Sequence, residues 1–521
     1  MSHTPSPQQQ AVIDWALEEK GHLNLIARAG CGKTSTLMML VDQLPEEDSI
    51  FVGAFNRSIA AELEARLKTA GHDWKHARAS TMHSAGLGAW RKQAPDVKVD
   101  KDKMKHILAG FAEDDESDAE VVKAVGGLII KLAGFAKQGA FGVGGQPEID
   151  DYSAYYQIID HFGLDMELPE GIDVCKLVDF TVDAIYASAK QDHEVVDFND
   201  MLWVPLRRNA RFWPYDWVLI DEAQDTNEAR RLIAYRMLKP KYGRLVAVGD
   251  PKQALYSFTG ADSRAMDMIK QGLDSEELNL TVTYRCPKKV VAHVNGLCPD
   301  LVAHEDNPDG VVRKLPYSSF DPEKVPDFWQ EASGLTPDDV ILCRKNAPLI
   351  SLAFAMIRKG IGCQIEGRDI AEGLVALANR WKRAKTLDKL LEKLDEYRNR
   401  EVAKAMEADN EAKAERITDQ CEALKVMAES LLEQGRTDRG DLIRSIRSMF
   451  GDTEPGQKPA VVTLSTVHKA KGREWKRVYI LGRNAYMPLP FAKLPWEMEA
   501  ENNIIYVAIT RAMEELVEIS V

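Results

Sequence analysis

The most constraining segment of this chain is Ala27 to Thr34, which reads Ala-Arg-Ala-Gly-Cys-Gly-Lys-Thr. It follows the apolar run Leu23 to Ile26 and precedes the apolar run Leu37 to Val41, as a loop between a buried strand and a helix would. Small residues in such a loop let backbone N–H groups wrap phosphate oxygens, and the helix N-terminus adds its positive dipole. The segment therefore predicts a phosphate-binding loop, with alanine at the first position where the general pattern has glycine.

Most residues of the loop would contact phosphate through their backbone N–H groups, and two side chains have separate chemical roles. The ammonium group of Lys33 is expected to neutralise the β and γ oxygens of a nucleoside triphosphate, and the Thr34 hydroxyl is expected to ligate Mg²⁺. ATP with Mg²⁺ is the ligand that this pattern predicts. The predicted ATP-binding residues of the loop are Ala29, Gly30, Cys31, Gly32, Lys33, Thr34 and Ser35.

Two further apolar runs end in polar residues that suit triphosphate chemistry. Trp217 to Ile220 leads into Asp221, which would hold Mg²⁺ through its water shell, and Glu222, which would orient and deprotonate the attacking water. Such a pair alone more often marks a solvated helix start, but the phosphate loop favours a metal ligand and a base. Leu245 to Val248 leads to Gln253, whose amide can donate to phosphate and accept from water.

Apolar, β-branched runs recur along the chain just before turns or before polar segments. Helical patterns lie between them, and this alternation predicts an α/β fold built on parallel sheets. The runs form an early set and a late set, so we expect two α/β cores. They are Leu23–Ile26, Ile50–Val52, Trp217–Ile220 and Leu245–Val248 in the early set, and Val340–Leu342, Val461–Leu464 and Val478–Leu481 in the late set.

Two stretches interrupt the alternation and predict helical insertions. Residues 90–195 have mostly helical patterns, broken at the glycine-rich segment Gly139 to Gly145. Residues 373–455 are rich in Ala, Glu, Lys and Leu, and the leucines at 387, 390, 391 and 394 follow the spacing of one helix face. An antiparallel helical hairpin fits the second stretch, while most of its charged residues are expected to form solvated helix faces.

Composition narrows the classes of protein that remain. The chain has 521 residues, well beyond the ~250 to 300 at which single cores stop growing, so several domains are expected. No apolar stretch approaches the ~18 residues of a membrane span, and the polar N-terminal segment lacks a secretory pattern. A net charge of -14 argues against a wholly basic surface that coats nucleic acid, but it allows a confined basic channel.

Taken in order, these segments resemble the motifs of the UvrD/Rep type of superfamily 1A DNA helicases, whose cores are RecA-like P-loop NTPase domains. Ala27 to Thr34 resembles motif I, Asp221 to Asp225 motif II, and Gly249 to Gln253 motif III. The amino-acid sequences of motifs Ia and VI are similar to those of F-box-type DNA helicases and phage relatives. Further resemblances are Gln8–Val12 to the Q motif, Ala54–Ser58 to motif Ia, Thr81–Ser84 to motif Ib, Asp197–Leu202 to the DFxDLL element, Thr283–Cys286 to motif IV, Thr466–Trp475 to motif V and Tyr506–Ala512 to motif VI.

The resemblance implies roles for residues outside the phosphate loop. Gln8 would read the adenine edge, Tyr284 would stack on adenine, and Glu474 would bind the ribose. Arg285 and Arg511 would reach the γ-phosphate as arginine fingers, which stabilise charge on the phosphoryl group in flight. The predicted catalytic set is Lys33, Glu222, Gln253, Arg285 and Arg511.

The same resemblance implies contacts with a nucleic-acid strand. Tyr256 and Phe258 offer aromatic faces for base stacking, although two aromatics at this spacing more often belong to a core. Family members carry Trp-Arg-Gly after the motif III tyrosine, where this chain has Phe258-Thr259-Gly260, and Phe55 stands one position closer to the motif Ia asparagine than the family aromatic does. The predicted strand-contacting residues are Phe55, Asn56, His83, Tyr256, Phe258 and His468.

A four-part organisation also follows from the resemblance. The two cores would each carry a helical insertion, and the second insertion is shorter than the family norm. The expected parts are core 1A at residues 1–89 and 196–278, insertion 1B at 90–195, core 2A at 279–372 and 456–521, and insertion 2B at 373–455.

The activity that the resemblance implies is ATP-driven strand separation by a monomer moving 3′ to 5′ on single-stranded DNA. Its substrates would be single strands and single/double-strand junctions in replication, repair or recombination, and the insertions would contact partner proteins. We expect a location in the cytoplasm of a bacterial or phage-infected cell, or in a eukaryotic nucleus, with no membrane association. Three alternatives remain open: a translocase that strips bound proteins with little unwinding, a nucleotide-gated P-loop interaction protein, and RNA as the substrate.

Overall fold

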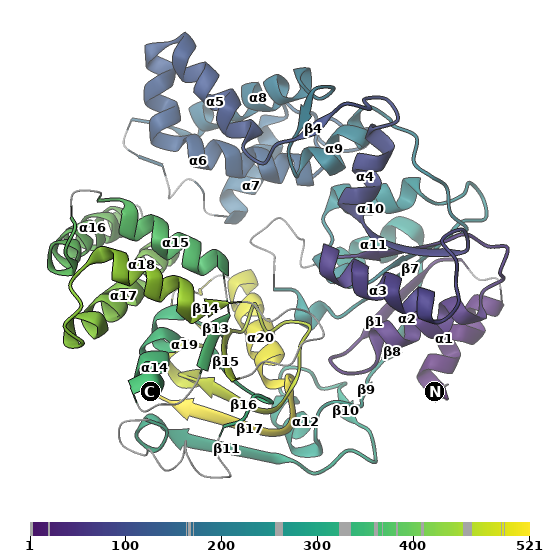
Figure 1. Cartoon of the computed structure of the whole chain (residues 1–521). Helices are drawn as coiled ribbons and strands as arrows, with labels where there is room; N and C mark the ends of the chain where they lie inside the picture. Colours follow the sequence, from purple (N-terminus) through teal and green to yellow (C-terminus); the bar gives the residue numbers. More distant parts are fainter. Residues whose placement is uncertain are drawn as a thin grey trace. The chain divides into compact units, whose positions relative to one another are not determined.

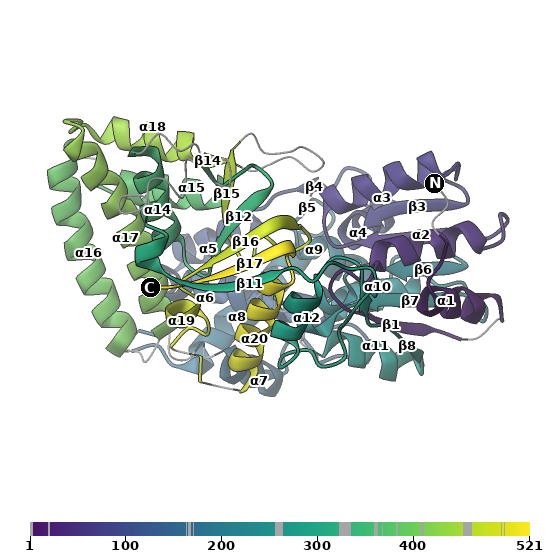
Figure 2. The same cartoon turned by 90° about the horizontal axis from the view of Figure 1, so that it is seen from below.

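The computed structural model of the chain forms two compact units (Figures 1 and 2). The first contains Met1–Arg28 and Gly32–Leu280, and the second contains Ala29–Cys31 and Thr281–Val521. The structure describes residues 4–18, 21–162, 164, 168–169, 171–255, 264–321, 335–358, 363–366, 368–381, 384–407, 411–451, 461–490, 492–493 and 495–521.

The first unit is built on a parallel sheet of six strands in the order β3-β2-β6-β7-β1-β8. The inner strands β1, β2 and β6 are buried along their whole length, and β7 is buried after its first residue, which explains why they read as apolar runs in the sequence. The predicted α/β fold with parallel sheets is therefore confirmed. The strands are β1 (Leu23–Ala27), β2 (Ile50–Ala54), β3 (Ala77–Thr81), β6 (Trp217–Ile220), β7 (Arg244–Gly249) and β8 (Glu276–Leu280).

Helices that connect these strands begin at local sequence signals. Ser6 and Gln9 form a capping box at the start of α1, and the side chains of Asn56 and Thr81 accept backbone N–H groups at the starts of α3 and α4. The connecting elements are α1 (Pro7–Leu17), α2 (Lys33–Gln43), α3 (Arg57–Thr69), α4 (Met82–Trp90), α9 (Asp200–Arg207), η2 (Ala223–Asp225), α10 (Glu228–Arg236), η3 (Pro251–Gln253) and α11 (Ala265–Leu273).

A helical bundle lies between α4 and α9 in the sequence, where a helical insertion is predicted, and α5 to α8 gather together in Figure 1. The long helix α6 ends at Gln138, directly before the glycine-rich segment. Its apolar face joins the core of the sheet in one continuous buried cluster. The bundle consists of α5 (Lys103–Asp114), α6 (Glu116–Gln138), α7 (Tyr152–Phe162) and α8 (Val174–Lys190), flanked by the paired strands β4 (Lys98–Val99) and β5 (Val195–Val196).

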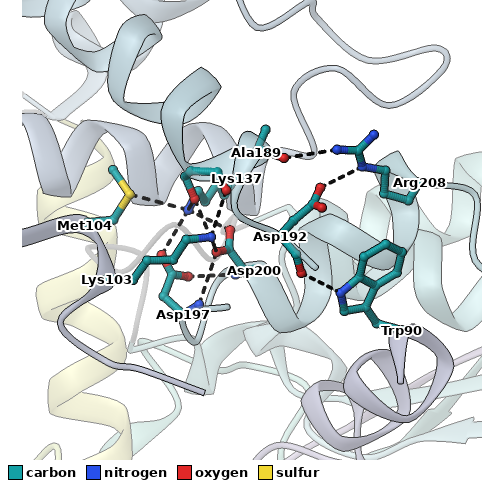
Figure 3. A network of polar contacts seen from close by, with 10 residues as sticks. Trp90, Lys103, Met104, Lys137, Ala189, Asp192, Asp197, Asp200 and Arg208 are labelled. Atoms are coloured by element: carbon teal, nitrogen blue, oxygen red, sulfur yellow. Dashed lines mark hydrogen bonds and ion pairs between the residues drawn. The ribbon is translucent and has the colours of Figure 1, made fainter. Parts of the chain in front are cut away.

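A buried cluster of charges joins this bundle to α9 (Figure 3). The ammonium group of Lys137 on α6 lies 2.9 Å from Asp197 Oδ2 and 2.7 Å from Asp200 Oδ1. Lys103 on α5 lies 2.7 Å from Asp200 Oδ2 and donates to the Ser188 carbonyl at 2.9 Å. Burial by itself would lower the pKa of Lys137, but the two aspartates raise it above the usual range. Each charge is removed from water and depends on the others to offset that loss.

The turn inside this cluster is closed by its own two aspartates. The Asp200 N–H donates to Asp197 Oδ1 at 2.7 Å, and the Asp197 N–H donates to Asp200 Oδ2 at 3.1 Å. Phe198 lies between them, and 54% of it is exposed. The buried charges therefore fix a turn that presents an aromatic ring to solvent.

The second unit is built on a parallel sheet of seven strands in the order β11-β17-β16-β12-β15-β13-β14. A separate parallel pair is formed by β9 (Val282–Thr283) and β10 (Val302–Ala303). The strands of the larger sheet are β11 (Val311–Pro316), β12 (Asp339–Cys343), β13 (Cys363–Glu366), β14 (Phe450–Gly451), β15 (Val462–Thr466), β16 (Trp475–Leu481) and β17 (Ala512–Ser520). The connecting elements are α12 (Lys288–Val294), η5 (Tyr317–Ser319), α14 (Asn346–Arg358), α19 (Arg483–Tyr486) and α20 (Pro495–Ile509).

Four helices of the second unit form the stretch that is predicted as a helical hairpin. The first two long helices pack along each other, and the stripe residues Leu387, Leu390 and Leu394 are buried between them and their neighbours. The hairpin is confirmed, while the expected boundary at residue 373 falls inside α15. The helices are α15 (Arg368–Asn379), α16 (Leu387–Glu407), α17 (Glu411–Glu433) and α18 (Arg439–Met449). In the part of the chain that the structure describes, none of the helices has both the length and the apolar composition of a membrane span.

The buried cluster predicts that two lysines on the same helix differ sharply in their effect on stability. Lys103→Met leaves Asp200 with one cation fewer and should lower the free energy of unfolding of the first unit by about 3 to 5 kcal/mol. Lys105→Met, two residues away, removes an exposed ion pair with Asp102 and should cost less than about 1 kcal/mol. Urea unfolding of both variants measures the difference, and equal midpoints would contradict the stabilising role of the cluster.

Candidate active site

Three neighbouring strands of the first sheet bring the predicted phosphate loop and the acidic residues to one edge. The phosphate loop follows β1, Asp221 and Glu222 follow β6, and Asp250 follows β7. These strands are adjacent in the order β6-β7-β1 and run parallel, so their carboxyl ends meet. This edge is where ligands bind in open parallel sheets.

The loop itself has the backbone shape of an anion cradle. Gly32 has a φ of 82° and forms the N-cap of α2, and its lack of a side chain leaves the first-turn N–H groups of that helix to face a ligand. A Cβ at Gly32 would lie 3.2 Å from the Gln9 amide nitrogen, which donates to the Thr36 hydroxyl at 3.1 Å. Gln9 therefore buttresses the loop, while Gln8, predicted to read adenine, is half-buried beside it.

Lys33 and Glu222 form an ion pair at the centre of this edge. The ammonium nitrogen of Lys33 lies 2.8 Å from Glu222 Oε1, and both side chains are largely buried. Burial would lower the pKa of Lys33, but Glu222, Asp250 and Asp221 raise it above the usual range. The loop lysine is therefore a stable cation that is held against the predicted catalytic base.

Asp221 lies beside the loop threonine in the position expected of a metal ligand. Its Oδ2 is 3.5 Å from Thr34 Oγ1, and its Oδ1 accepts the Glu222 N–H at 2.9 Å. Burial, with Glu222 nearby, raises the pKa of Asp221 to about 6. Hydroxyl and carboxylate oxygens are ligands that Mg²⁺ prefers, so Thr34 and Asp221 fit the ion that the loop implies.

Glu222 adopts a backbone conformation that side chains rarely occupy. Its φ is 53° and its ψ is 44°, which is the left-handed region. A non-glycine residue held in that region stores strain of order 1 to 3 kcal/mol, and such strain concentrates at functional sites. The strand end therefore aims this carboxylate at Lys33 at a conformational cost.

A chain of amide and carboxylate contacts links the segments that follow β6 and β7. Gln224 donates to Glu222 Oε2 and accepts the Asp250 N–H at 3.1 Å. Asp250 in turn accepts from Gln253 Nε2 at 2.8 Å and from Arg28 at 2.9 Å. Gln253, predicted as the γ-phosphate sensor, is buried in this chain. Sequence reasoning missed Gln224 and Arg28, although Gln224 lies inside the segment that resembles motif II.

In the second unit, two predicted site residues contact each other directly. Arg285 Nε lies 2.5 Å from Glu474 Oε2, so the predicted arginine finger is paired with the predicted ribose ligand. Tyr284, predicted to stack on adenine, is 46% exposed and packs against the ring of His304. This unit also contains Ala29, whose N–H donates to the Tyr506 hydroxyl at 3.0 Å.

Arg511 is buried and His468 is uncharged, so neither is a charged group on the surface of the second unit. Arg511 is 1% exposed, and its guanidinium donates to the carbonyls of Val507 and Arg473, each at 3.0 Å. In this conformation the second predicted finger is engaged inside its own unit. Burial, with Arg344 and then Lys471 nearby, lowers the pKa of His468 to about 3, so its ring is neutral.

Two of the predicted strand-contacting residues of the first unit line a small cavity beside Asp221 and Glu222. Phe55, His83 and Arg230 line it together with Asp221 and Glu222. Arg230 lies over the Phe55 ring, 4.9 Å from its centroid. The cavity wall is therefore shared by residues predicted to contact a strand and by residues predicted to act on ATP.

The exposed aromatic surface at this place is Phe198 and not His83. The two rings are stacked with centroids 4.1 Å apart, and His83 is 6% exposed beneath Phe198. Burial, with Arg230 and then Arg57 nearby, lowers the pKa of His83 to about 3, so it carries no charge for a phosphate. Asn56 is exposed, but its side-chain oxygen is engaged at the start of α3, where it accepts the Ile59 N–H. Sequence reasoning missed Phe198, which stands between the two aspartates of the buried cluster. The predicted contacts Tyr256 and Phe258 lie outside the described residues.

Comparison with known families matches both units. The model of the UvrD/REP helicase N-terminal domain matches residues 6–160 and 167–274. The model of the UvrD-like helicase C-terminal domain matches residues 371–521.

Individual relatives agree with these matches. The chain is 24% identical to F-box DNA helicase protein 1 of Schizosaccharomyces pombe, over 98% of this chain and 57% of that protein. It is 25% identical to a probable DNA helicase II homolog of Mycoplasma pneumoniae, over 64% of this chain and 59% of that protein. It is 27% identical to ATP-dependent DNA helicase UvrD2 of Mycobacterium tuberculosis, over 58% of this chain and 47% of that protein. The matched part is thus about half to three-fifths of the length of these relatives.

Proposed function

Because the chain belongs to the UvrD/Rep helicase family, we propose that it is an ATP-dependent DNA helicase or translocase that moves along single-stranded DNA. The observation that carries the proposal is the meeting of Lys33, Thr34, Asp221 and Glu222 at one sheet edge. Phosphate cradle, metal ligands and base then have one common target, which is the triphosphate of ATP.

The Lys33–Glu222 ion pair supports a simple activation step. Phosphate oxygens of ATP would compete with Glu222 for the Lys33 ammonium group, because both are anions that need the same buried cation. Lys33 would move onto the β and γ oxygens, and the freed Glu222 carboxylate would accept a proton from the attacking water. Mg²⁺, held by Thr34 and Asp221, would neutralise phosphate charge when bound. ATP binding would in this way release the base that hydrolysis needs.

Residues of the second unit would complete the transition-state charge balance. Arg285 and Arg511 are proposed to reach the γ-phosphate, for which Arg285 must exchange Glu474 for phosphate and Arg511 must leave the carbonyls it now contacts. Both exchanges are favoured only while the γ-phosphate is present, so hydrolysis would reverse them. Such a cycle would drive directional movement, which we propose to run 3′ to 5′.

Strand binding is proposed to use the aromatic surface beside the shared cavity. Phe198 would stack on a base, with His83 as the apolar support beneath it. Phe55 and Arg230 would contact the neighbouring nucleotide, and the cavity they share with Glu222 offers a route by which a bound strand stimulates hydrolysis. The phosphodiester backbone would follow the exposed Asn56 amide.

We propose single-stranded DNA and single/double-strand junctions as substrates in replication, repair or recombination. The protein would act as a monomer wherever its DNA lies, in a bacterial or phage-infected cytoplasm or in a nucleus. The four-part division into cores 1A and 2A with insertions 1B and 2B is proposed on the same grounds. A short 2B region, α15 to α18, favours as a second candidate a translocase that strips bound proteins with little unwinding.

Lys33→Ala and Glu222→Gln separate binding from hydrolysis. Lys33→Ala should abolish turnover, because the buried charge for the phosphates is lost. Glu222→Gln should bind a fluorescent ATP analogue but hydrolyse ATP at least about 100-fold more slowly, since a positioned base contributes roughly 10² to 10⁴ in rate. Steady-state ATPase with and without oligo(dT) gives the readout. Normal hydrolysis by Glu222→Gln would remove Glu222 as the base. Turnover that single-stranded DNA fails to raise would favour a nucleotide-gated interaction protein.

Phe198→Ala tests the strand-contacting surface. Loss of one base–aromatic stack should cost about 1 to 3 kcal/mol, or at least about fivefold in the oligo(dT) concentration that half-saturates the ATPase. The ATPase rate without DNA should stay the same, because Phe198 is not among the residues that line the cavity with Asp221 and Glu222. Trp74→Ala is the matched control, since Trp74 is a similarly exposed aromatic, 66% exposed, in the loop before β3. Equal DNA affinity of both variants would contradict the assignment.

Strand displacement assays with 3′-tailed and 5′-tailed duplexes decide between the two candidate activities. Unwinding of the 3′-tailed duplex alone is the expected result for a 3′ to 5′ helicase. ATPase stimulation without displacement on either substrate, together with removal of streptavidin from a biotinylated single strand, would instead identify the stripping translocase. RNA oligonucleotides in the same ATPase assay test the remaining substrate class.

A further inference from the structure

We call the carboxyl edge of β6, β7 and β1, which carries the phosphate loop, the nucleotide edge. A groove on the first unit extends away from this edge and is not used by the proposed activity. It has a volume of about 190 Å³, and its floor is apolar, formed by Phe51, Met237 and their neighbours. We call it the Trp213 groove, because the exposed indole of Trp213 forms one wall. Arg78 and Lys92 stand at its rim, and both are exposed.

Strand direction places the Phe51 and Arg78 end of this groove away from the edge that carries the phosphate loop, while Ser84 of α4, which follows His83, lines its other end. Phe51 and Arg78 are the second residues of β2 and β3, whereas Phe55 and His83 follow the carboxyl ends of the same strands. The four residue steps from Phe51 to Phe55 span about 13 Å at ~3.3 Å per residue. A ligand seated on Phe51 and Arg78 would therefore leave the phosphate loop free.

The backbone beside Trp213 is anchored. Trp213 is 62% exposed, yet its neighbour Phe212 is buried and Tyr215 is anchored by its N–H, which donates to the Met237 carbonyl at 2.7 Å. The Lys92 ammonium lies 6.0 Å from the Trp213 ring centroid and 3.4 Å from the Arg211 carbonyl. Because the segment that carries Trp213 is anchored in this way, binding a partner there costs less backbone entropy than ordering a loose loop would.

Charge in the groove has one sign. Arg78 and Lys92 line it, and none of its lining residues in the described part of the chain is acidic. The whole chain carries a net charge of -14, so this cationic rim contrasts with the rest of the molecule. A rim of this kind attracts an anionic partner and fixes its register, while the apolar floor supplies affinity.

From this combination we propose that the Trp213 groove binds an acidic peptide segment of a partner protein, with one large apolar side chain seated on the floor and flanking carboxylates at Arg78 and Lys92. A nucleic-acid strand is a poorer fit. A base on that floor would leave its polar edge facing Phe51 and Met237, and an unpaired buried polar group is costly. An apolar side chain has no such groups to satisfy.

A substitution on helix α4 can block the groove without disturbing the residues around it. Small residues of α4 face it, and Gly88 is exposed with no atom within 4 Å of the position that a Cβ would take. Gly88→Leu should therefore fill the groove without displacing its surroundings. Gly127 on α6 is also exposed with open space at its Cβ position, so Gly127→Leu is the matched control.

The test measures fluorescence anisotropy of fluorescein-labelled seven-residue peptides of Glu and Asp, with Phe, Leu or Trp at the centre, added to the full chain. At least one should bind, and its affinity should fall at least about tenfold with Gly88→Leu and with the double variant Arg78→Ser, Lys92→Ser, but not with Gly127→Leu. An alanine at the peptide centre, or lysines in place of its acids, should reduce binding similarly.

Three outcomes would overturn the proposal. The first is that no acidic peptide binds more tightly than its lysine counterpart. The second is binding that Gly88→Leu leaves unchanged. The third is oligo(dT) affinity that falls with Gly88→Leu while peptide affinity does not, which would make the groove a nucleic-acid site. Because peptide binding is measured without ATP, its failure is distinguishable from failure of the ATPase.

Discussion

Parallel pairing of β6, β7 and β1 is the constraint on which the rest of the site depends. Because the three strands run in one direction, Asp221, Asp250 and the phosphate loop emerge at the same edge, although 187 residues separate Thr34 from Asp221 and 222 separate Arg28 from Asp250 along the chain. The Lys33–Glu222 ion pair forms across this edge in a largely buried position. The same low-dielectric surroundings that make the pair strong would also make its proposed exchange for phosphate an effective signal of nucleotide binding.

The buried charges behind the site have a different purpose from the ion pair within it. Lys103 and Lys137 come from the helical bundle, and Asp197 and Asp200 come from the turn before α9. Apolar residues of similar volume often stabilise such a location as well or better, so the cluster is explained less by net stability than by geometry. It specifies one arrangement of the turn, and with it the position of the exposed Phe198 ring. We regard it as the connection through which the bundle supports the surface that we propose to contact a strand.

Sequence reasoning succeeded where the signal was local. Strands buried on both faces were recognised as apolar runs, and the leucine stripe of α16 predicted its packed face. Strands with mixed patterns were missed: β3 and β8 lie at the sheet edges, where one side faces solvent, and β17 carries charged residues within a strand paired on both sides. Periodicity alone does not report which neighbours a strand will have.

By itself, the sequence determined the α/β class, the family, and the residue types of the nucleotide edge, because phosphate binding needs small residues, a lysine and a hydroxyl at consecutive positions. Tertiary structure decided which of these side chains are exposed and which are covered or hydrogen-bonded. His83 is covered by Phe198, Arg511 is turned onto backbone carbonyls, and Gln9 rather than Gln8 supports the loop. Burial and hydrogen-bond partners come from residues distant in the chain, and no local pattern encodes them.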